Sequence, residues 1–284
     1  MITVAEVNAI NTKQNRVTNP IHHSRFQNLE KSLNDLFLKE LNSFDSIFLK
    51  ISPNVVKKAA MFLSGLTLRP AAIGICGETA SGKSTIVMDS MAIVEEFCET
   101  AITRINTDDY YYDRSKEVQK AGSFAEFAKD YDLDTPAAIE LSLMKTHIKT
   151  LLNHQEVFLP KYDMSGTAIR IDKHRLAKPS SIIVAEGLYT LIDDIADIFD
   201  VKIYVDIDKN VQKQRFFERA QQRGLGDSAD TIFKNASQKA QIYVHPCAQN
   251  ADIILNGETS RTKYRQFINL LLELVESTNY NFAL

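Results

Sequence analysis

The chain has 284 residues, of which 44% are hydrophobic, and its formal net charge is −3, so it can bury the core of one large α/β domain with an appendage. Because this charge gives no basic footprint for nucleic acid, and because no apolar run reaches the ~18 residues of a membrane span, we expect neither as a partner. The N-terminal residues lack the pattern of a secretory leader, and we expect a cytoplasmic protein.

Residues 1–69 are expected to form an arm followed by a helical extension. Residues 1–25 are rich in Asn, Thr and His and lack hydrophobic periodicity, which is typical of a poorly ordered arm. After the arm, apolar residues recur at helical spacing: Leu29, Leu33, Leu36, Phe37 and Leu41. A second helix is predicted over residues 55–66. We expect these helices to pack against the rest of the chain or to contact another protein.

Residues 77–84 read Gly-Glu-Thr-Ala-Ser-Gly-Lys-Ser, a complete G-x-x-x-x-G-K-S phosphate-binding pattern. Such a loop points backbone N–H groups at phosphate oxygens, while Lys83 reaches the β- and γ-phosphates and Ser84 offers its hydroxyl to Mg²⁺. The residues that we assign to binding of ATP or GTP are Gly77, Glu78, Thr79, Ala80, Ser81, Gly82, Lys83, Ser84 and Thr85.

The segments on both sides of this loop favour a phosphate site over a chance glycine turn. Residues 71–76 form a short apolar run, typical of a buried parallel strand. After the loop, apolar residues lie along one face of a helix that begins near Ser84: Val87, Met91, Val94 and Cys98. A helix in this position directs the partial positive charge of its N-terminus at a polyphosphate. The chain is therefore expected to bind a nucleoside triphosphate.

From Pro70 onward, strand-like and helix-like segments alternate, which predicts an α/β domain over residues 70–284 with a mostly parallel sheet flanked by helices. The predicted strands are residues 71–76, 101–106, 157–160, 181–185, 201–207 and 252–255. The predicted helices are residues 136–152, 209–223, 228–242 and 261–275. Thr135 can cap the first of these helices, and Pro136 suits its first position.

Carboxylates follow two of the predicted strands, and ligands of open α/β sheets gather at the carboxyl ends of strands. Asp108 and Asp109 come after residues 101–106, and Glu186 follows residues 181–185. Phosphoryl transfer needs a group that takes the acceptor proton and a group that holds the metal. We assign the proton to Asp108 and Mg²⁺ to Ser84 with Glu186, and we interpret Asp109 as a turn carboxylate.

Three arginines have the spacing of one helical face within residues 209–223. Arg215, Arg219 and Arg223 stand at positions i, i+4 and i+8, with no acidic residue among the three. Aligned guanidinium groups repel one another unless anions lie between them, so we interpret this face as a lid that clamps the triphosphate. Arg215 and Arg219 are assigned to catalysis together with Lys83, and Arg223 to nucleotide binding. The alternative is a solvated surface, with pairing to Glu218 or Asp227.

These motifs, in this order, resemble the uridine kinase family of P-loop kinases, which is related more distantly to phosphoribulokinase and pantothenate kinase. The resemblance runs from about residue 70 to residue 257. Its motifs are the phosphate loop at 77–84, Thr-Asp-Asp-Tyr-Tyr at 107–111, Tyr-Asp-Leu-Asp-Thr-Pro at 131–136, Pro-Lys-Tyr-Asp at 160–163, Ala-Glu-Gly at 185–187 and the arginine face.

The resemblance implies a kinase that phosphorylates a nucleoside such as uridine or cytidine. In the family, the aspartate that matches Asp108 is the base for the nucleoside 5′-hydroxyl, and the one that matches Asp134 holds ribose hydroxyls. The tyrosine that matches Tyr162 lines the base pocket, and we also assign Tyr111 and Arg170 to the substrate. By analogy, the chain is expected to form a homo-oligomer.

Two departures from the family pattern leave the acceptor open. Leu133 stands where an aromatic residue is usual, and residues 164–170 lack the histidine that reads a pyrimidine edge. The alternative acceptors are a sugar phosphate or a pantothenate-like alcohol. A regulatory GTP-binding module is a further alternative, because Asp163 to Gly166 fits D-x-x-G, although no N-K-x-D follows.

Overall fold

The computed structural model describes residues 20–67, 69–96, 102–223, 226 and 228–277. The residues expected to form an arm fall mostly outside these ranges. Residues 20–25, however, belong to helix α2 (Pro20–Leu41), so the prediction of an arm up to residue 25 was wrong for these six positions. None of the described helices is both long enough and apolar enough to cross a membrane.

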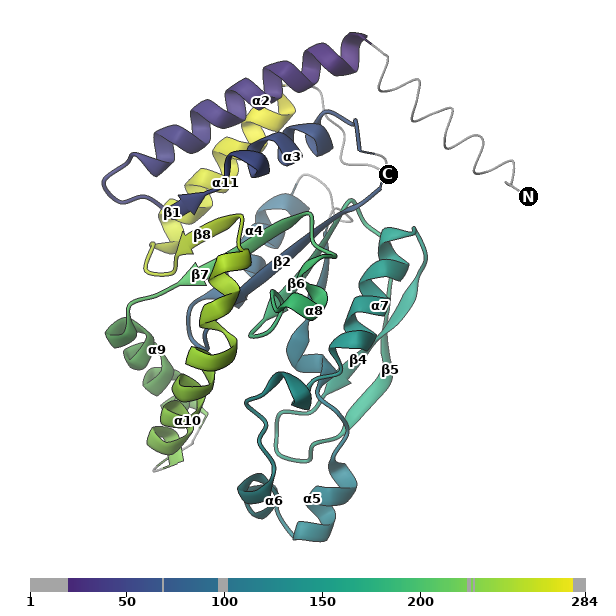
Figure 1. Ribbon diagram of the computed structural model, residues 1–284, viewed down its shortest axis with the longest axis vertical. Helices are drawn as coiled ribbons and strands as arrows, with labels where there is room; N and C mark the ends of the chain where they lie inside the picture. The colour runs from purple at the N-terminus through teal and green to yellow at the C-terminus, as the bar shows by residue number, and fades with distance from the viewer. Residues whose placement is uncertain (1–19, 68, 97–101, 224–225, 227, 278–284) are drawn as a thin grey trace, which may run out of the picture.

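A six-stranded sheet forms the centre of the molecule, with strand order β1-β8-β7-β2-β6-β3 (Figure 1). Its strands are β1 (Phe48–Ile51), β2 (Ala71–Gly77), β3 (Ile102–Asn106), β6 (Ile182–Gly187), β7 (Val201–Asp206) and β8 (Ile253–Asn256). All neighbours are parallel except β1, which runs antiparallel to β8. The central strands are nearly continuous apolar runs, as expected for a sheet that is covered on both faces. The prediction of a mostly parallel α/β sheet is confirmed.

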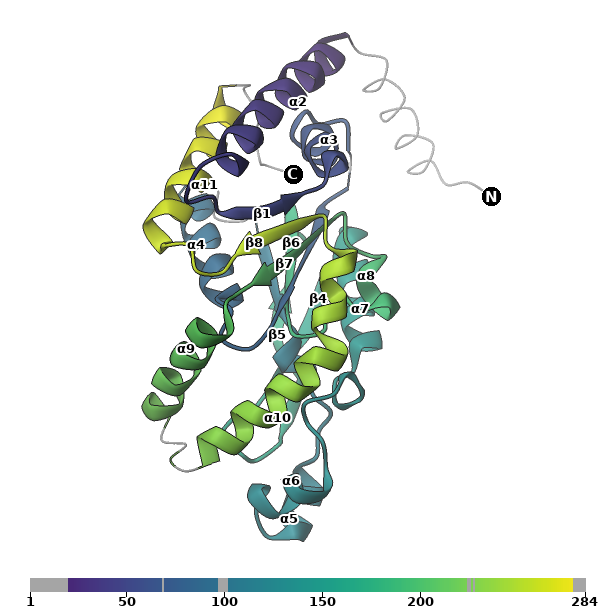
Figure 2. The same cartoon turned by 60° about the vertical axis from the view of Figure 1, so that its left-hand side comes forward.

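Helices cover both faces of this sheet, and each face has its own hydrophobic core. On one face pack α2, α3 (Pro53–Leu63), α4 (Lys83–Glu95) and α11 (Arg261–Glu276), with Leu33 and Phe267 among the buried residues (Figure 2). On the other face lie α7 (Leu141–Leu152) and the 3₁₀ segment η3 (His245–Asn250). Helices α3, α7 and α11 each bury an apolar face in these cores, as amphipathic helices do.

Most of the remaining helices lie around the carboxyl ends of the strands. They are α5 (Ser115–Ala121), α6 (Phe124–Asp130), α9 (Lys209–Gln222) and α10 (Ser228–Tyr243), together with the 3₁₀ segments η1 (Thr107–Tyr110) and η2 (Pro136–Ala138). The short helix α8 (Asp193–Ala196) packs instead against α7. Asp208 caps α9 through hydrogen bonds from the N–H groups of Asn210 and Val211. Helices α9 and α10 follow the sequence prediction closely.

The predicted helix over residues 136–152 begins later than expected. Residues 136–138 form only a 3₁₀ turn, and α7 starts at Leu141. Ile139 is extended and forms a bridge with Tyr111, and the N–H of Glu140 donates to the carbonyl of Tyr110 at 2.8 Å. Because these backbone groups pair with the segment after β3, they are not available to a helix.

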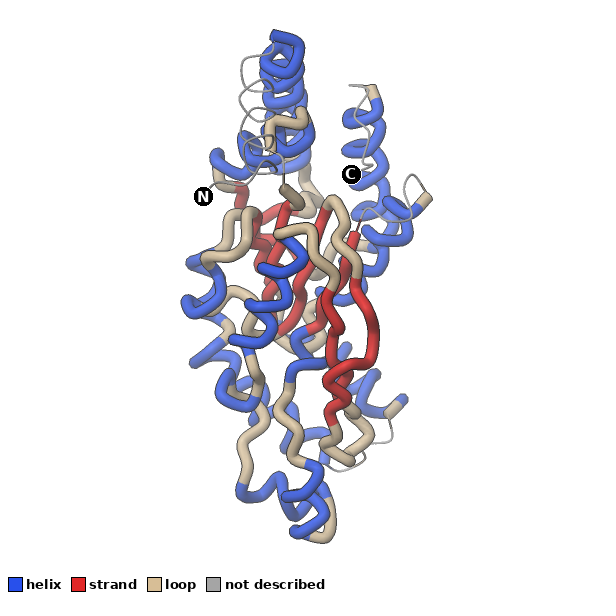
Figure 3. The backbone as a smooth tube through the Cα atoms, turned by 90° about the vertical axis from the view of Figure 1, so that its right-hand side faces the viewer, coloured by secondary structure: helices blue, strands red, loops and turns tan. Residues whose placement is uncertain are grey.

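The predicted strand at residues 157–160 is a strand, but it does not belong to the central sheet. It is part of β4 (Val157–Tyr162), which pairs antiparallel with β5 (Arg170–Ala177) in a separate two-stranded ribbon, drawn in red in Figure 3. Six of the eight side chains of β5 are exposed, so this ribbon is not buried on both faces as a central strand must be.

Strand β1 was missed, because the sequence of the N-terminal extension predicts only helices. This strand has four residues, and it adds the extension to the edge of the sheet through β8. Leu29 and Leu33 of α2 are fully buried in the same core as Phe48. The extension therefore packs against the α/β core, as one of the two alternatives expected. The domain division between residues 69 and 70 stays a prediction.

Candidate active site

The phosphate loop connects the end of β2 to the start of α4, as the sequence predicts. Gly82 has φ +101°, a left-handed conformation that glycine adopts without strain, and a Cβ on Gly77 would lie 2.6 Å from the carbonyl oxygen of Val205. Lys83 is buried, and its Nζ donates to the carbonyl of Glu78 at 2.7 Å. The hydroxyl of Ser81 is buried and has no hydrogen-bond partner. The left-handed Gly82 and the ammonium group of Lys83, which both line the cavity over this loop, give the loop the curvature and the charge that suit a phosphate.

A cavity of about 710 Å³ opens over this loop at the carboxyl ends of the strands. The sequence-predicted residues that line it are Thr79, Ala80, Gly82, Lys83, Ser84, Thr85, Asp108, Tyr111, Asp134, Glu186, Arg215, Arg219 and Arg223. Five others do not line it: Gly77, Glu78, Ser81, Tyr162 and Arg170. The structure thus brings the phosphate loop, both key carboxylates and the lid arginines to one cavity.

Asp108 lies in η1, where the chain leaves β3. The side chain of Asn106 accepts a hydrogen bond from the N–H of Asp108 at 3.1 Å, which fixes the turn. Burial raises the pKa of Asp108, and the charge of Lys83 opposes this rise. Burial also lowers the pKa of Lys83, and the charges of Cys76 and Asp108 oppose that shift. Lys83 and Asp108 line the same cavity, and each charge favours the ionised form of the other.

Glu186 is buried at the end of β6, and both of its carboxylate oxygens are engaged. Ser84 Oγ donates to Oε2 at 2.7 Å, and Arg104 Nε donates to Oε1 at 2.7 Å, with a second bond from Arg104 Nη2. Arg104 comes from the neighbouring strand β3. It neutralises a carboxylate that would be costly to bury alone.

Sequence reasoning missed Arg104. The signal was present, because Arg104 is the one charged residue of β3, and a buried glutamate needs a partner. To assign Arg104 as the partner of Glu186, one has to know that β3 and β6 are neighbouring strands.

The residues at this point fit Mg²⁺. A serine hydroxyl and a glutamate carboxylate are hard oxygen donors, 2.7 Å apart and next to a loop built for phosphates. Within the described ranges there is no group of three His, Cys, Asp or Glu side chains that could hold a metal alone. Mg²⁺ characteristically uses one or two protein ligands and completes its shell with phosphate oxygens and water.

The lid arginines lie over the phosphate loop and form no ion pair with a described carboxylate. Arg219 Nη2 donates to the hydroxyl of Thr79 at 2.7 Å, and Arg215 Nη1 donates to the carbonyl of Gly257 at 2.8 Å. Burial lowers the pKa of Arg219, followed by the repulsion of Arg223. Pairing with Glu218, the alternative for a solvated surface, is not observed, because Glu218 accepts from Gln214 instead. Asp227 lies outside the described residues.

The far end of the cavity contains Asp134 and aromatic side chains. Burial raises the pKa of Asp134, and the nearby charge of Asp132 adds to the rise. Tyr111 and Tyr189 line this end, together with Lys239 of α10, which forms an ion pair with Asp132. Sequence reasoning missed Tyr189 and Lys239, because no motif marks them.

Two residues assigned to the substrate lie behind the cavity wall. The ring of Tyr162 packs against that of Tyr111, with centroids 5.1 Å apart, and its buried hydroxyl has no hydrogen-bond partner. Arg170 forms ion pairs with Glu140 and Asp172. In this state both residues support the wall around Tyr111, and their contact with a substrate stays a prediction.

Comparison with known families gives one match that spans most of this region. The model described as "Phosphoribulokinase / Uridine kinase family" matches residues 72–262. A uridine kinase of Halobacterium salinarum is 31% identical over 216 residues, which cover 75% of this chain and 89% of that protein.

Solved structures with the same fold include two kinases of low identity. D-glycerate 3-kinase from Cryptococcus neoformans has a TM-score of 0.50 and 12% identity, covering 83% of this chain and 96% of that one. Phosphoribulokinase from Rhodobacter spheroides has a TM-score of 0.50 and 14% identity, covering 66% of this chain and 70% of that one. At this identity the two structures support the P-loop kinase fold alone.

Proposed function

Because the chain belongs to the phosphoribulokinase and uridine kinase family, and is therefore a phosphotransferase, we propose that it transfers the γ-phosphate of ATP or GTP to the 5′-hydroxyl of a nucleoside such as uridine or cytidine. One observation carries the proposal: a single cavity is lined by Lys83 and Ser84 of the phosphate loop, by Asp108, and by Asp134. The nucleoside is supported by the uridine kinase from Halobacterium salinarum.

The donor triphosphate is held by the phosphate loop. Backbone N–H groups of residues 77–82, the N-terminus of α4 and the Lys83 ammonium would contact phosphate oxygens. The left-handed Gly82 gives the loop the curvature that this requires. Binding by backbone and dipole does not distinguish ATP from GTP, so the donor base stays open.

Ser84 and Glu186 would hold Mg²⁺. The bound ion supplies positive charge to the β- and γ-phosphate oxygens. Glu186 is kept in one orientation by Arg104, so its second oxygen stays directed at Ser84.

Asp108 takes the proton of the acceptor hydroxyl. Its raised pKa makes it a stronger base than an ordinary aspartate, and the charge of Lys83 keeps it from rising further. Lys83 and Arg219 offset the negative charge that spreads over the transferring phosphoryl group. Exclusion of water by the walls of the cavity protects the donor from hydrolysis.

The acceptor end fits a ribose and a flat ring. The carboxylate of Asp134 is suited to accept hydrogen bonds from two neighbouring hydroxyls, and Tyr111 and Tyr189 offer aromatic surface to a base. A second candidate is another small alcohol with a negative charge, because Lys239 adds an ammonium group to this end of the cavity. The cytoplasmic location and the homo-oligomer stay predictions.

The proposal is tested by a panel of acceptors with ATP and with GTP, followed by mass spectrometry of the products. We expect a nucleoside 5′-monophosphate from uridine or cytidine. With 2′,3′-dideoxyuridine we expect kcat/KM to fall by about 100-fold or more, since Asp134 is left without partners. Phosphorylation of ribulose 5-phosphate, D-glycerate or pantothenate, without phosphorylation of any nucleoside, would overturn the nucleoside assignment.

A further inference from the structure

One side chain of the phosphate loop points away from the nucleotide cavity. Glu78 is buried, with 7% of its surface exposed, and it does not line the cavity. Its carboxylate is held from two other elements: Nε2 of Gln212 in α9 donates to Oε2 at 3.0 Å, and Nε2 of His245 at the start of η3 lies 2.5 Å from Oε1. A carboxylate in this position therefore connects the loop to two elements that are distant in the sequence.

Gln212 makes a second contact with the same loop. Its Nε2 also donates to the carbonyl of Thr79 at 3.0 Å, and its side chain is almost fully buried. Arg219 of α9 contacts Thr79 as well, because it donates to the Thr79 hydroxyl. The side-chain amide of Gln212 therefore connects the first turn of α9 to two adjacent residues of the loop, Glu78 and Thr79.

The residue that contacts the loop, Gln212, lies on the same helix as two of the lid arginines. Arg215 and Arg219 stand three and seven residues after Gln212, so all three lie on one face of the helix. A small rotation of α9 about its axis would move both guanidinium groups away from the loop. The contacts of Gln212, which lies in the first turn of α9, oppose that rotation.

We propose that Gln212 is a positioning residue, which acts through Glu78 and Thr79 to hold Arg215 and Arg219 over the triphosphate. His245 completes the arrangement, because it holds the other oxygen of Glu78 and so leaves Oε2 for Gln212. The inference rests on the proposed nucleotide site, and it does not depend on which alcohol is the acceptor.

The test measures binding of a non-hydrolysable triphosphate analogue with Mg²⁺ by calorimetry, in the absence of any acceptor. Gln212→Leu, which keeps the volume and removes the donor, is expected to weaken binding about tenfold or more. The matched control is Gln214→Leu on the same helix, since Gln214 is exposed and bonds only to Glu218 among the described contacts. The control is expected to bind as the wild type does.

A double-mutant cycle separates positioning from general loss of structure. If Gln212 acts through the lid, adding Gln212→Leu to Arg219→Ala costs much less affinity than Gln212→Leu costs alone. Additive losses, or a folded Gln212→Leu variant with wild-type affinity, would overturn the proposal.

A second pair of variants serves if Gln212→Leu does not fold. Gln212→Glu places two carboxylates together, and we expect it to weaken binding; adding Glu78→Gln removes that repulsion and is expected to recover part of the affinity. No recovery would count against the role of Glu78. A wild-type protein that binds the analogue but phosphorylates no nucleoside would refute the proposed acceptor and leave this inference standing.

Discussion

At the scale of single residues, Asp108 and Lys83 are the pair on which the chemistry depends. Burial shifts the pKa of Asp108 upward and that of Lys83 downward, so each is moved toward its neutral form, and their mutual attraction opposes both shifts. A base with a raised pKa holds a proton more firmly, which suits removal of a proton from an alcohol. Burial of these two charged groups lowers the stability of the folded protein at neutral pH.

The raised pKa of Asp108 predicts how kcat/KM changes at acidic pH. Because the ionised form is the base, kcat/KM should fall as the pH drops through a value above the ordinary 3.8 of aspartate. Stability runs in the opposite sense: a raised folded-state pKa contributes stability at low pH that is lost as the pH rises through it. A profile of kcat/KM against pH that stays flat down to the ordinary aspartate value would contradict this assignment.

Substitution of Gly187, the last residue of β6, is expected to destabilise the fold strongly. A Cβ at this position would lie 1.5 Å from Oγ1 and 2.6 Å from Cβ of Thr107, which is fully buried. Gly187→Ala should therefore lower the free energy of unfolding by at least about 3 kcal/mol. Urea unfolding measures this. Gly122→Ala is the control, because nothing lies within 4 Å of a Cβ there and only its φ of +85° is unfavourable; equal losses for the two variants would refute the steric argument.

At the scale of elements, the helix that follows the phosphate loop is fixed to the C-terminal helix. Asp89 of α4 is buried and accepts hydrogen bonds from Arg261 at 2.6 and 2.9 Å and from Arg265 at 3.2 Å. The hydroxyls of Ser90 and Tyr264 lie 2.8 Å apart beside this pair. These contacts hold α4 against α11, and the N-terminus of α4 faces the cavity.

Asp89→Asn is expected to lower the free energy of unfolding at neutral pH by about 1–3 kcal/mol, a modest range because both arginines are partly exposed to solvent. The hydrogen bond from Arg261 is the main cause of the lowered pKa of Asp89. Its contribution is present above the ordinary aspartate value and is lost as the pH falls through the folded-state value. Wild type and variant should therefore converge in acid, as urea unfolding at several pH values can measure; a gap that stays constant would disprove the electrostatic origin. Asp130→Asn on α6 is the matched exposed control.

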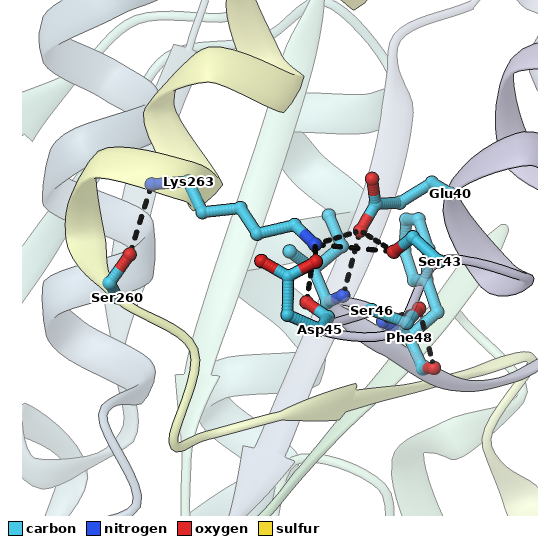
Figure 4. Close-up of polar contacts among 8 residues, drawn as sticks. Glu40, Ser43, Asp45, Ser46, Phe48, Ser260 and Lys263 are labelled. Carbon is cyan, nitrogen blue, oxygen red and sulfur yellow. Dashed lines mark hydrogen bonds and ion pairs between the residues drawn. The ribbon is translucent and has the colours of Figure 1, made fainter.

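At the scale of the whole molecule, the N-terminal extension is part of the fold. Lys263 of α11 contacts the end of α2 and the turn before β1 (Figure 4). It forms ion pairs with Glu40 of α2 at 3.1 Å and with Asp45 of the turn, and it donates to the hydroxyl of Ser43 at 3.2 Å. The carboxylate of Glu40 also accepts from the N–H of Ile47 at 3.0 Å. These contacts fix the turn against α11, whose first residue, Arg261, lines the cavity.

Three aromatic rings join the extension to the core, and they predict the effect of a single truncation. Phe48 of β1 packs on Phe37 of α2 and on Phe267 of α11, with centroids 5.2 and 5.1 Å away. Phe48→Ala should lower the free energy of unfolding by about 3–5 kcal/mol, because it leaves a cavity where three elements meet. Phe44→Ala, four residues earlier and fully exposed, should leave it unchanged. Similar unfolding midpoints for the two variants would mean that the extension does not share the core.

The parts of the molecule that could be predicted are those encoded by local sequence. The phosphate loop, Asp108 after β3, Glu186 at the end of β6 and the arginine face of α9 each belong to a short motif, and the structure gathers them in one cavity. The parts that were missed depend on pairing between distant segments. Strand β1 exists because β8 offers an edge, and α7 begins late because Glu140 bonds to Tyr110. Arg104 acquires its role from a neighbouring strand.

The central claim is that Asp108 is the base opposite the phosphate loop, and one variant tests it most directly. Asp108→Asn keeps the shape of the side chain and removes the base, so turnover with the best nucleoside should fall by about 10²–10⁴-fold. Its affinity for a triphosphate analogue with Mg²⁺ should stay within a few-fold of wild type, and its melting temperature at neutral pH should not fall, because a buried charge is removed. The measurement is the rate of nucleoside 5′-monophosphate formation by wild type and variant under saturating donor. Near-wild-type turnover by Asp108→Asn would contradict the account.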